Sequence, residues 1–282
     1  MRNGEGACAR RLCVEPERLS KGEIMSNLEV ASETGSATGG SGLSQWQRVT
    51  STFTAPSKTF EDIKRGNKSW WLPFVIVVLS GAFLFGAITT EVTWKGVFEN
   101  NQRNMPDFAK RMMENMTPEQ KAKQEQQGPV SQEITWAVSP LGLLIMDLIA
   151  AGVLLATINF GFGGKAKFGS MLAVTLYAGL VQWPIKLFLG GIALFAGALP
   201  EAFSPQNPAG TNLAYYLPQH ETSPVLYALA MQLDITAIWC MVVTSIGVAI
   251  VAGVKRSSGY IAVFGWWAIL VLISAAFAAI MG

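Results

Sequence analysis

The 282-residue sequence contains few charged residues, few cysteines and a single histidine. Twenty-one Lys and Arg and 19 Asp and Glu give a net charge of +2, which points to no particular partner and gives no reason to expect nucleic-acid binding. Three Cys and one His exclude a disulfide-stapled scaffold and argue against a structural zinc site, which takes four ligands.

The charges are also unevenly distributed. Residues 1–70 hold 18 of the 40 and residues 91–133 hold 13, which leaves 9 for the 149 residues from position 134 onward. A soluble domain needs charged faces throughout, whereas a membrane bundle confines charge to loops and ends. This distribution argues against a water-soluble enzyme and predicts an all-α, polytopic transmembrane helix bundle.

Five apolar stretches are long enough to cross ~30 Å of hydrocarbon. They are residues 70–90, 138–160, 168–187, 226–254 and 259–281, which make a transmembrane domain over 69–282 with an external loop at 91–137. Trp183-Pro184 predicts a break late in the third stretch.

Basic residues in the short connections predict the orientation of the spans. Lys165 and Lys167 lie in one short connection and Lys255 and Arg256 in another, whereas residues 200–225 contain no Lys or Arg. The positive-inside rule then places the N-terminus in the cytoplasm and the C-terminus outside a cell (inner) membrane.

The N-terminal 68 residues divide into two parts. Residues 1–42 have little to bury and are expected to be disordered; residues 1–24 are either an upstream mis-start before Met25, which we favour slightly, or a genuine tail. Residues 43–68 predict two cytoplasmic amphipathic helices, which we expect to lie on the headgroup layer. The alternative is a docking surface for a partner. Their apolar positions are Leu43, Trp46, Val49, Phe53, Phe60 and Ile63.

The external loop carries its own helix signals. Phe108, Met112 and Met116 recur at four-residue steps, and Thr117, Pro118 and Gln120 form an N-cap, a first-turn proline and a capping box. These signals predict two short helices that form a small cap over the first two spans. The methionines could grip a hydrophobic ligand, but packing within the chain is the simpler interpretation.

Two acids fall within predicted spans, where ionised groups are costly and face inward. Counted from the ends of their spans, Asp147 and Asp234 lie at a similar depth, and Gln182 and Lys186 lie in the same half of the membrane. We expect these four residues to form one polar cluster, mainly structural, with a proton or solute site as the alternative. Lys186 could instead extend to the headgroups.

Small residues at four-residue spacing predict close helix packing. Ser245, Ala249 and Gly253 form such a row on the fourth span, and Gly152 and Ala156 on the second. The same rows could serve homo-oligomerisation.

No motif indicates catalysis, a cofactor or a metal. The segment GFGGKA at 161–166 lacks the Gly-Lys-Ser/Thr ending of a phosphate loop. A Ser–His hydrolase would need His220, the single histidine, but no Gly-x-Ser-x-Gly motif lies near any predicted span. Asp147 and Asp234 lack the flanking residues typical of intramembrane aspartyl proteases, and Cys8, Cys13 and Cys240 have no metal-ligand spacing. We predict no enzyme activity.

Three stretches resemble bacterial members of the Yip family (Ypt/Rab-interacting-protein domain). They are FTAPSKTFEDIKRGNKSWWLPFVIVVL at 53–79, FGFGGKAKFGSMLAVTLYAGLVQWP at 160–184 and LDITAIWCMVVTSIGVAIVAGVKRSSGYIAVFGWW at 233–267. The resemblance implies a five-span membrane protein with a cytoplasmic N-terminus. Eukaryotic relatives bind Rab-type GTPases, but the Asp-Leu-Tyr-Gly-Pro type motif of those relatives is missing here, so GTPase binding is not predicted.

Two functions remain open at this stage. The first is a non-enzymatic scaffold that organises membrane or binds other membrane proteins or its own copies. The second is a transporter or channel for a small solute or ion that uses Asp147 and Asp234. Transporters favour paired repeats and matched broken helices, and the sequence signals only one break, so the scaffold is preferred.

Overall fold

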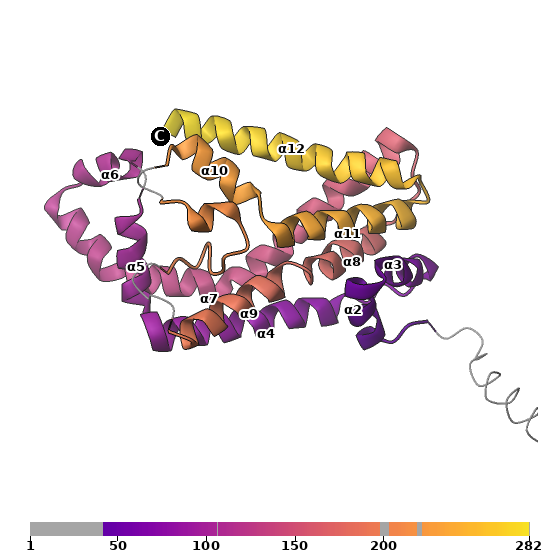
Figure 1. Cartoon of the computed structure of the whole chain (residues 1–282), viewed down its shortest axis with the longest axis horizontal. Helices are drawn as coiled ribbons and strands as arrows, with labels where there is room; N and C mark the ends of the chain where they lie inside the picture. The colour runs from indigo at the N-terminus through magenta and orange to yellow at the C-terminus, as the bar shows by residue number, and fades with distance from the viewer. Residues whose placement is uncertain (1–41, 106, 198–202, 219–221, 282) are drawn as a thin grey trace, which may run out of the picture. The chain divides into compact units, whose positions relative to one another are not determined.

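The computed structural model describes residues 42–105, 107–197, 203–218 and 222–281 (Figure 1). The predicted disordered tail lies outside the described residues except for Gly42, and His220 also lies outside them.

Within the described residues, five helical segments are long and apolar enough to cross a membrane: Trp71–Val92, Pro118–Gly161, Phe168–Phe195, Ile235–Ala252 and Arg256–Ile280. The first contains α4 (Trp71–Ala87), and the second contains α7 (Pro118–Ala156). The third is divided into α8 (Phe168–Gly179) and α9 (Trp183–Phe195). The fourth is α11 (Ile235–Ala252), preceded by the short α10 (Pro224–Gln232), and the fifth is α12 (Arg256–Met281). The prediction of an all-α, five-span membrane bundle is confirmed.

The second span is much longer than its apolar part. Helix α7 begins at the predicted capping box, in which the Thr117 side chain and the Gln120 side chain each bond the other's backbone, and it continues for 39 residues. The second short helix that we expected in the external loop is therefore the first part of this span. Pro129 and Pro140 lie inside the helix without ending it.

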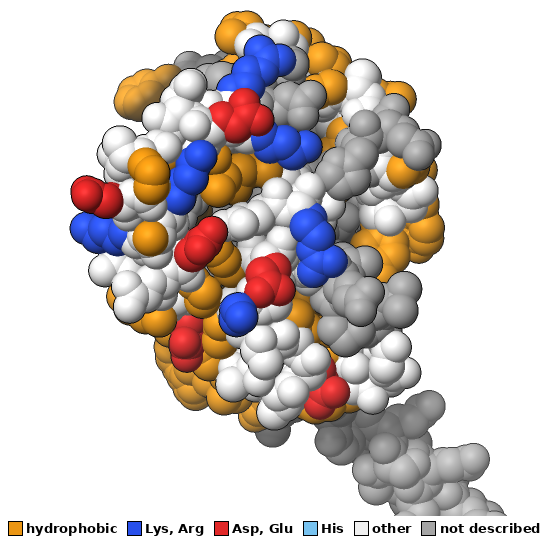
Figure 2. All heavy atoms as spheres, turned by 90° about the vertical axis from the view of Figure 1, so that its left-hand side faces the viewer, with side chains coloured by type: hydrophobic (Ala, Val, Ile, Leu, Met, Phe, Trp, Pro, Cys, Tyr) orange, Lys and Arg blue, Asp and Glu red, His pale blue; other side chains and the backbone are white. Residues whose placement is uncertain are grey.

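Helices α5 (Trp94–Arg103) and α6 (Asp107–Glu114) lie with the start of α7 at one end of the bundle, and we call these three segments the cap (Figure 1). Figure 2 views this end, where Lys, Arg, Asp and Glu side chains are interspersed around the surface. Met112 is 66% exposed, so its stripe is not fully covered by packing, and the side chain of Phe108 lies outside the described residues.

The main hydrophobic core surrounds α8. Every residue from 170 to 179 is buried, among them Met171, Val174 and Tyr177, and α7 and α11 pack against this helix. A second core joins α4, α5 and α9 through Leu84, Val97 and Leu194.

Helices α2 (Gln45–Thr54) and α3 (Pro56–Arg65) lie at the end opposite the cap (Figure 1). Phe60 and Ile63 of α3 are fully buried in the main core, where a Cβ on Gly247 of α11 would meet the Phe60 ring at 3.0 Å. Helix α3 therefore packs into the bundle through its apolar side chains, and its position at the headgroup layer stays a prediction. The apolar stripe of α2 is only partly covered: Val49 packs against the main core, whereas Trp46 and Phe53 remain exposed.

The outer spans are far less covered by protein. In the most hydrophobic 18-residue window of each span, the buried share is 11% for α12 and 17% for α7, against 50% for the α8–α9 and α11 spans. Their apolar surfaces suit contact with lipid.

Candidate functional site

One of the five spans, α8–α9, is interrupted, and a second break directly precedes the α11 span. Between α8 and α9 the chain makes a turn at residues 180–182, where Pro184, in the first turn of α9, needs no hydrogen-bond partner. Between α10 and α11, Leu233 and Asp234 leave the helical conformation, and Asp234 is extended with φ −108° and ψ 121°. Lys186, in the first turn of α9, meets Asp234 at this second break.

Asp234 accepts hydrogen bonds through both carboxylate oxygens. Oδ1 accepts from the backbone N–H groups of Thr236 (2.9 Å) and Ala237 (3.1 Å) and from the Thr236 hydroxyl (2.6 Å). Oδ2 accepts from the Lys186 ammonium and the Thr211 hydroxyl, both at 2.8 Å. One carboxylate thus caps α11 and neutralises the buried lysine, whose side chain is 11% exposed.

The segment 203–217 covers this ion pair. Its backbone pairs with the α10–α11 break, because the Leu213 N–H donates to the Leu233 carbonyl and the Ile235 N–H donates to the Thr211 carbonyl. Asn207 and Asn212 are buried and bond to each other through their side-chain amides. Irregular backbone is tolerated at membrane depth where the protein satisfies its polar groups, and this pairing satisfies that condition.

A close approach fixes the segment against α9. A Cβ on Gly190 would lie 2.6 Å from the Pro208 Cβ and 3.0 Å from its carbonyl oxygen, so only glycine allows this contact. Beyond it, Asn100 of α5 donates to the Phe203 carbonyl at 3.1 Å. The segment is therefore held by α5, α9 and the helix break together.

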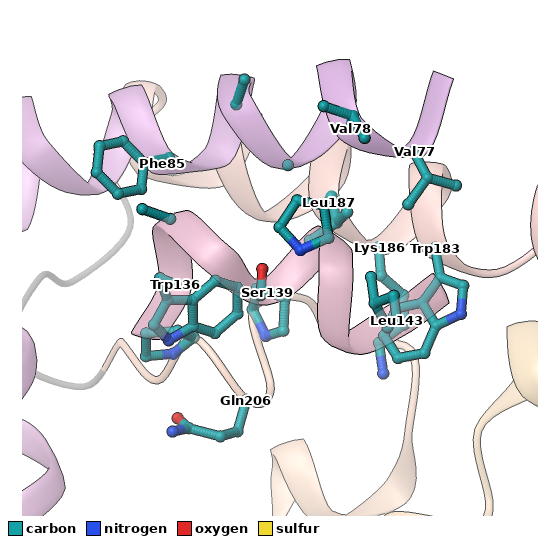
Figure 3. Close-up of a pocket in the computed structure, with 16 residues that line it drawn as sticks. Val77, Val78, Phe85, Trp136, Ser139, Leu143, Trp183, Lys186, Leu187 and Gln206 are labelled. Atoms are coloured by element: carbon teal, nitrogen blue, oxygen red, sulfur yellow. The ribbon is translucent and has the colours of Figure 1, made fainter. Parts of the chain in front are cut away.

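A cavity of about 330 Å³ lies beside the ion pair, between α4, α7, α9 and residues 205–208 (Figure 3). Figure 3 shows Val77, Val78 and Phe85 on one helix, with Trp136, Leu143 and Trp183 among the facing residues. Lys186 is part of the wall, so the cavity and the ion pair form one site.

The other predicted cluster members are placed differently. Asp147 lies by Thr175 of α8 and near Cys240 of α11. Cys240 is six residues beyond Asp234, which corresponds to ~9 Å along a helix axis. Gln182 lies at the α8–α9 break, and among the described residues no side-chain hydrogen bond joins it to either acid. The structure thus brings Lys186 and Asp234 together and leaves Asp147 and Gln182 out of that pair.

The small residues also divide into two groups. A Cβ on Gly259 of α12 would lie 2.3 Å from the Ser245 carbonyl oxygen and 3.0 Å from the Ala249 Cβ, so α11 and α12 cross closely there. Gly253 instead ends α11 in the left-handed conformation, with φ 71°. On α7, Gly152 has open space where a Cβ would stand and Ala156 is exposed, so no close crossing forms at that row.

Sequence reasoning missed a second buried cation, Arg48, which is 1% exposed. Its guanidinium donates to the carbonyls of Asn67 (3.0 Å) and Ser69 (3.2 Å) and to the Asn67 side chain (3.1 Å), and its Nε lies 3.5 Å from Asp62. The Tyr177 ring lies 5.4 Å from the guanidinium carbon. The position of Arg48 among exposed polar residues of an amphipathic helix gave no signal of this burial.

Arg48 joins α2 and α3 to the start of α4 and to α8. The Tyr177 hydroxyl donates to Gln45 at 2.8 Å, which adds a direct bond from α8 to α2. The two N-terminal helices are therefore fixed to the bundle by a caged charge as well as by Phe60 and Ile63.

No group of three or more His, Cys, Asp or Glu side chains that could hold a metal ion occurs in the parts of the chain that the structure describes. The arrangement is a buried ion pair at two helix breaks next to an apolar cavity, inside a polytopic membrane helix bundle.

The fold and this site define a class of protein, the multi-pass α-helical membrane proteins with a broken helix in the bundle. Within that class, a sequence model of the Yip1 domain matches residues 50–278, and the chain belongs to the Yip family. The comparisons with curated proteins and with solved structures gave no significant match.

Proposed function

We propose that this protein is a bacterial-type, non-enzymatic Yip-family scaffold that binds membrane partners or further copies of itself. In this proposal residues 69–282 form the membrane domain, α2 and α3 lie in the cytoplasm, and the cap and the C-terminus lie outside. The basic short connections Lys165–Lys167 and Lys255–Arg256 lie at the α2–α3 end, which supports this orientation.

The observation that carries the proposal is the fixed position of α2 and α3. The caged Arg48 and the buried Phe60 hold the two helices to the bundle, while Trp46 is 64% exposed and Phe53 is 40% exposed. Large aromatic side chains presented on a rigid support lose little conformational entropy when they are covered, and such residues anchor protein interfaces. The surface formed by Trp46 and Phe53 is called the α2 face below.

The test is affinity purification from gently solubilised membranes, with cross-linking before extraction. The wild-type chain is expected to recover defined protein partners or a homo-oligomer, and Trp46→Ser combined with Phe53→Ser is expected to lose them. Met112→Ser, which removes an exposed apolar residue from the cap, is the matched control. Unchanged recovery with the α2-face variant would refute the proposed surface.

A second candidate function is transport of a small solute or ion. It is supported by the ion pair between Lys186, next to the break in the α8–α9 span, and Asp234, at the break before α11, because broken helices with buried charges are typical of transporter sites. Ion- or proton-dependent flux into liposomes that is lost in Asp234→Asn would favour it. Liposomes that show no flux under a proton, sodium or potassium gradient would favour the scaffold.

A further inference from the structure

The cavity beside the ion pair has an apolar wall that the scaffold and transport hypotheses leave unused. Its sides are formed by Val77, Gly81 and Phe85 of α4, Leu143 of α7 and Trp183 of α9. At about 330 Å³ it lies near the lower end of the volumes of small-molecule sites, which run from ~300 to ~1,000 Å³.

The charge in the wall is already neutralised. The Lys186 ammonium donates to Asp234 at 2.8 Å, so the methylene stem of the lysine is the part left to line the cavity. The other polar lining residues are Ser139 and Gln206, whose side chains carry no formal charge. A wall of this kind suits an apolar occupant better than an ion or a cluster of water molecules.

The cavity has the depth of one leaflet. From Val77 to Phe85 it follows α4 for eight residues, which is ~12 Å at 1.5 Å per residue. Half of a ~30 Å hydrocarbon core is ~15 Å. Phe85 lies toward the cap end of α4, and Lys186 lies at the other end of the cavity, near Val77 (Figure 3). In a bilayer that these spans cross, the cavity would fall in the leaflet on the cap side.

The bilayer itself can reach this space. Helix α4 packs along α9 but contacts α7 over a shorter stretch, which leaves the cavity between the first two spans. Leu79 and Leu141 follow the lining residues Val78 and Pro140 in the chain and are 62% and 63% exposed, so α4 and α7 both carry exposed apolar side chains close to the cavity. An unfilled cavity loses packing contacts in proportion to its size, and hydrocarbon chains are the material next to this one.

We propose that the cavity binds one acyl chain of a membrane phospholipid from the leaflet on the cap side, with the end of the chain toward Lys186. The bound lipid fills the space between α4, α7 and α9 and contacts residues 205–208. This site does not involve the α2 face, and it shares the Lys186 side chain with the ion pair.

The first test uses the wild-type chain in nanodiscs made with phosphatidylethanolamine that carries a photoreactive diazirine near the end of one acyl chain. Cross-links mapped by mass spectrometry are expected to concentrate on the cavity residues of α4 and α7. Ile269 and Ile273 of α12 are exposed apolar residues outside the cavity and serve as the internal control. Labelling that spreads over α12 as strongly as over Val78 and Leu143 would overturn the proposal.

The second test fills the cavity. A Cβ on Gly81 meets open space, so Gly81→Leu is expected to occupy the acyl-chain position without a backbone clash. Gly86→Leu is the matched control, because Gly86 is on the same helix, also has open space and does not line the cavity. Native mass spectrometry after mild delipidation is expected to show a several-fold loss of the retained phospholipid in Gly81→Leu and no loss in Gly86→Leu.

A folding check keeps this test decisive. If Gly81→Leu lowers the melting temperature more than Gly86→Leu does, Leu143→Trp is used as the filling variant in its place. This substitution fills the same space from α7. Equal lipid retention in the wild type, the folded filling variant and Gly86→Leu would refute the site.

Discussion

Two side-chain cations are buried in the part of the chain that the structure describes, and they are held in different ways. Arg48 donates to two backbone carbonyls and one amide oxygen from residues within 21 positions of it, with Asp62 as a further neighbour. Lys186 has one carboxylate partner, Asp234, 48 residues away. Local neutral acceptors spread the stabilisation of Arg48 over several bonds, whereas the pairing of Lys186 depends on a single distant acid.

This difference predicts how much stability is lost when one partner of each cation is removed. A buried charge that loses its only counter-charge is strongly destabilising, whereas a charge with several hydrogen bonds retains most of its solvation. Substitutions at the two sites should therefore differ in size, although both cations are almost fully buried.

The largest loss of stability is expected for Asp234→Asn, at the break between α10 and α11. Asp234→Asn keeps an oxygen that can cap α11 but leaves the Lys186 ammonium without a counter-charge, so the free energy of unfolding should fall by ~3–5 kcal/mol. Adding Lys186→Met should recover much of this loss, because the uncompensated charge is then removed. Unfolding by sodium dodecyl sulfate in mixed micelles measures both variants, and a double variant as unstable as Asp234→Asn would contradict the explanation.

A smaller effect is expected for Arg48→Lys. Lysine keeps the charge but cannot reproduce the fork that bonds Asn67 and Ser69 together, which should cost ~2 kcal/mol. Because the cage fixes the N-terminal helices, limited proteolysis near residue 66 should become faster while the spans stay intact. Arg65→Lys, at an exposed position, is the control and should leave the cleavage rate unchanged.

A still smaller effect is expected for Asp62→Asn, which is the direct counterpart of Asp234→Asn. The carbonyl and amide acceptors of Arg48 remain, so the loss should be ~1–2 kcal/mol in the same unfolding measurement. A loss as large as that of Asp234→Asn would show that the two cations are held in the same way.

The smallest effect is expected for Asp147→Asn. Asp147 lies by Thr175 and Cys240, with no ion pair among the described residues, and asparagine preserves its shape and its acceptor oxygen. The free energy of unfolding should change by less than ~1 kcal/mol. A loss comparable to that of Asp234→Asn would mean that Asp147 is coupled to the ion pair after all.

Much of this architecture could be predicted from the sequence, because lipid imposes apolar composition on each span and the Thr117–Gln120 capping box is a local signal. Depth counting placed Lys186 and Asp234 in the same half of the membrane. It therefore predicted that these two residues belong to one polar cluster. The geometry of their ion pair could not be derived, because it depends on the break at Leu233 and Asp234, where the sequence has no proline or glycine. The signal that was available is Asp234 itself, since Asp before Ile-Thr-Ala is a strong N-cap.

Other features depend on tertiary contacts that no local pattern records. The sequence of α2 does not distinguish a buried Arg48 from a solvated one, because its cage is assembled from the turn after α3. Gly259 packs against Ser245 and Ala249, whereas Gly152 has the same spacing pattern and faces open space. Small-residue rows identify helices that can approach closely, and the three-dimensional arrangement decides which of them do.

The length of α7 has a mechanical consequence. Its 39 residues extend ~58 Å at 1.5 Å per residue, about 28 Å more than the hydrocarbon core that it crosses. The helix therefore joins the cap to the part of the bundle beside α8 without an intervening loop. A movement of the cap relative to the bundle would require this helix to tilt or bend.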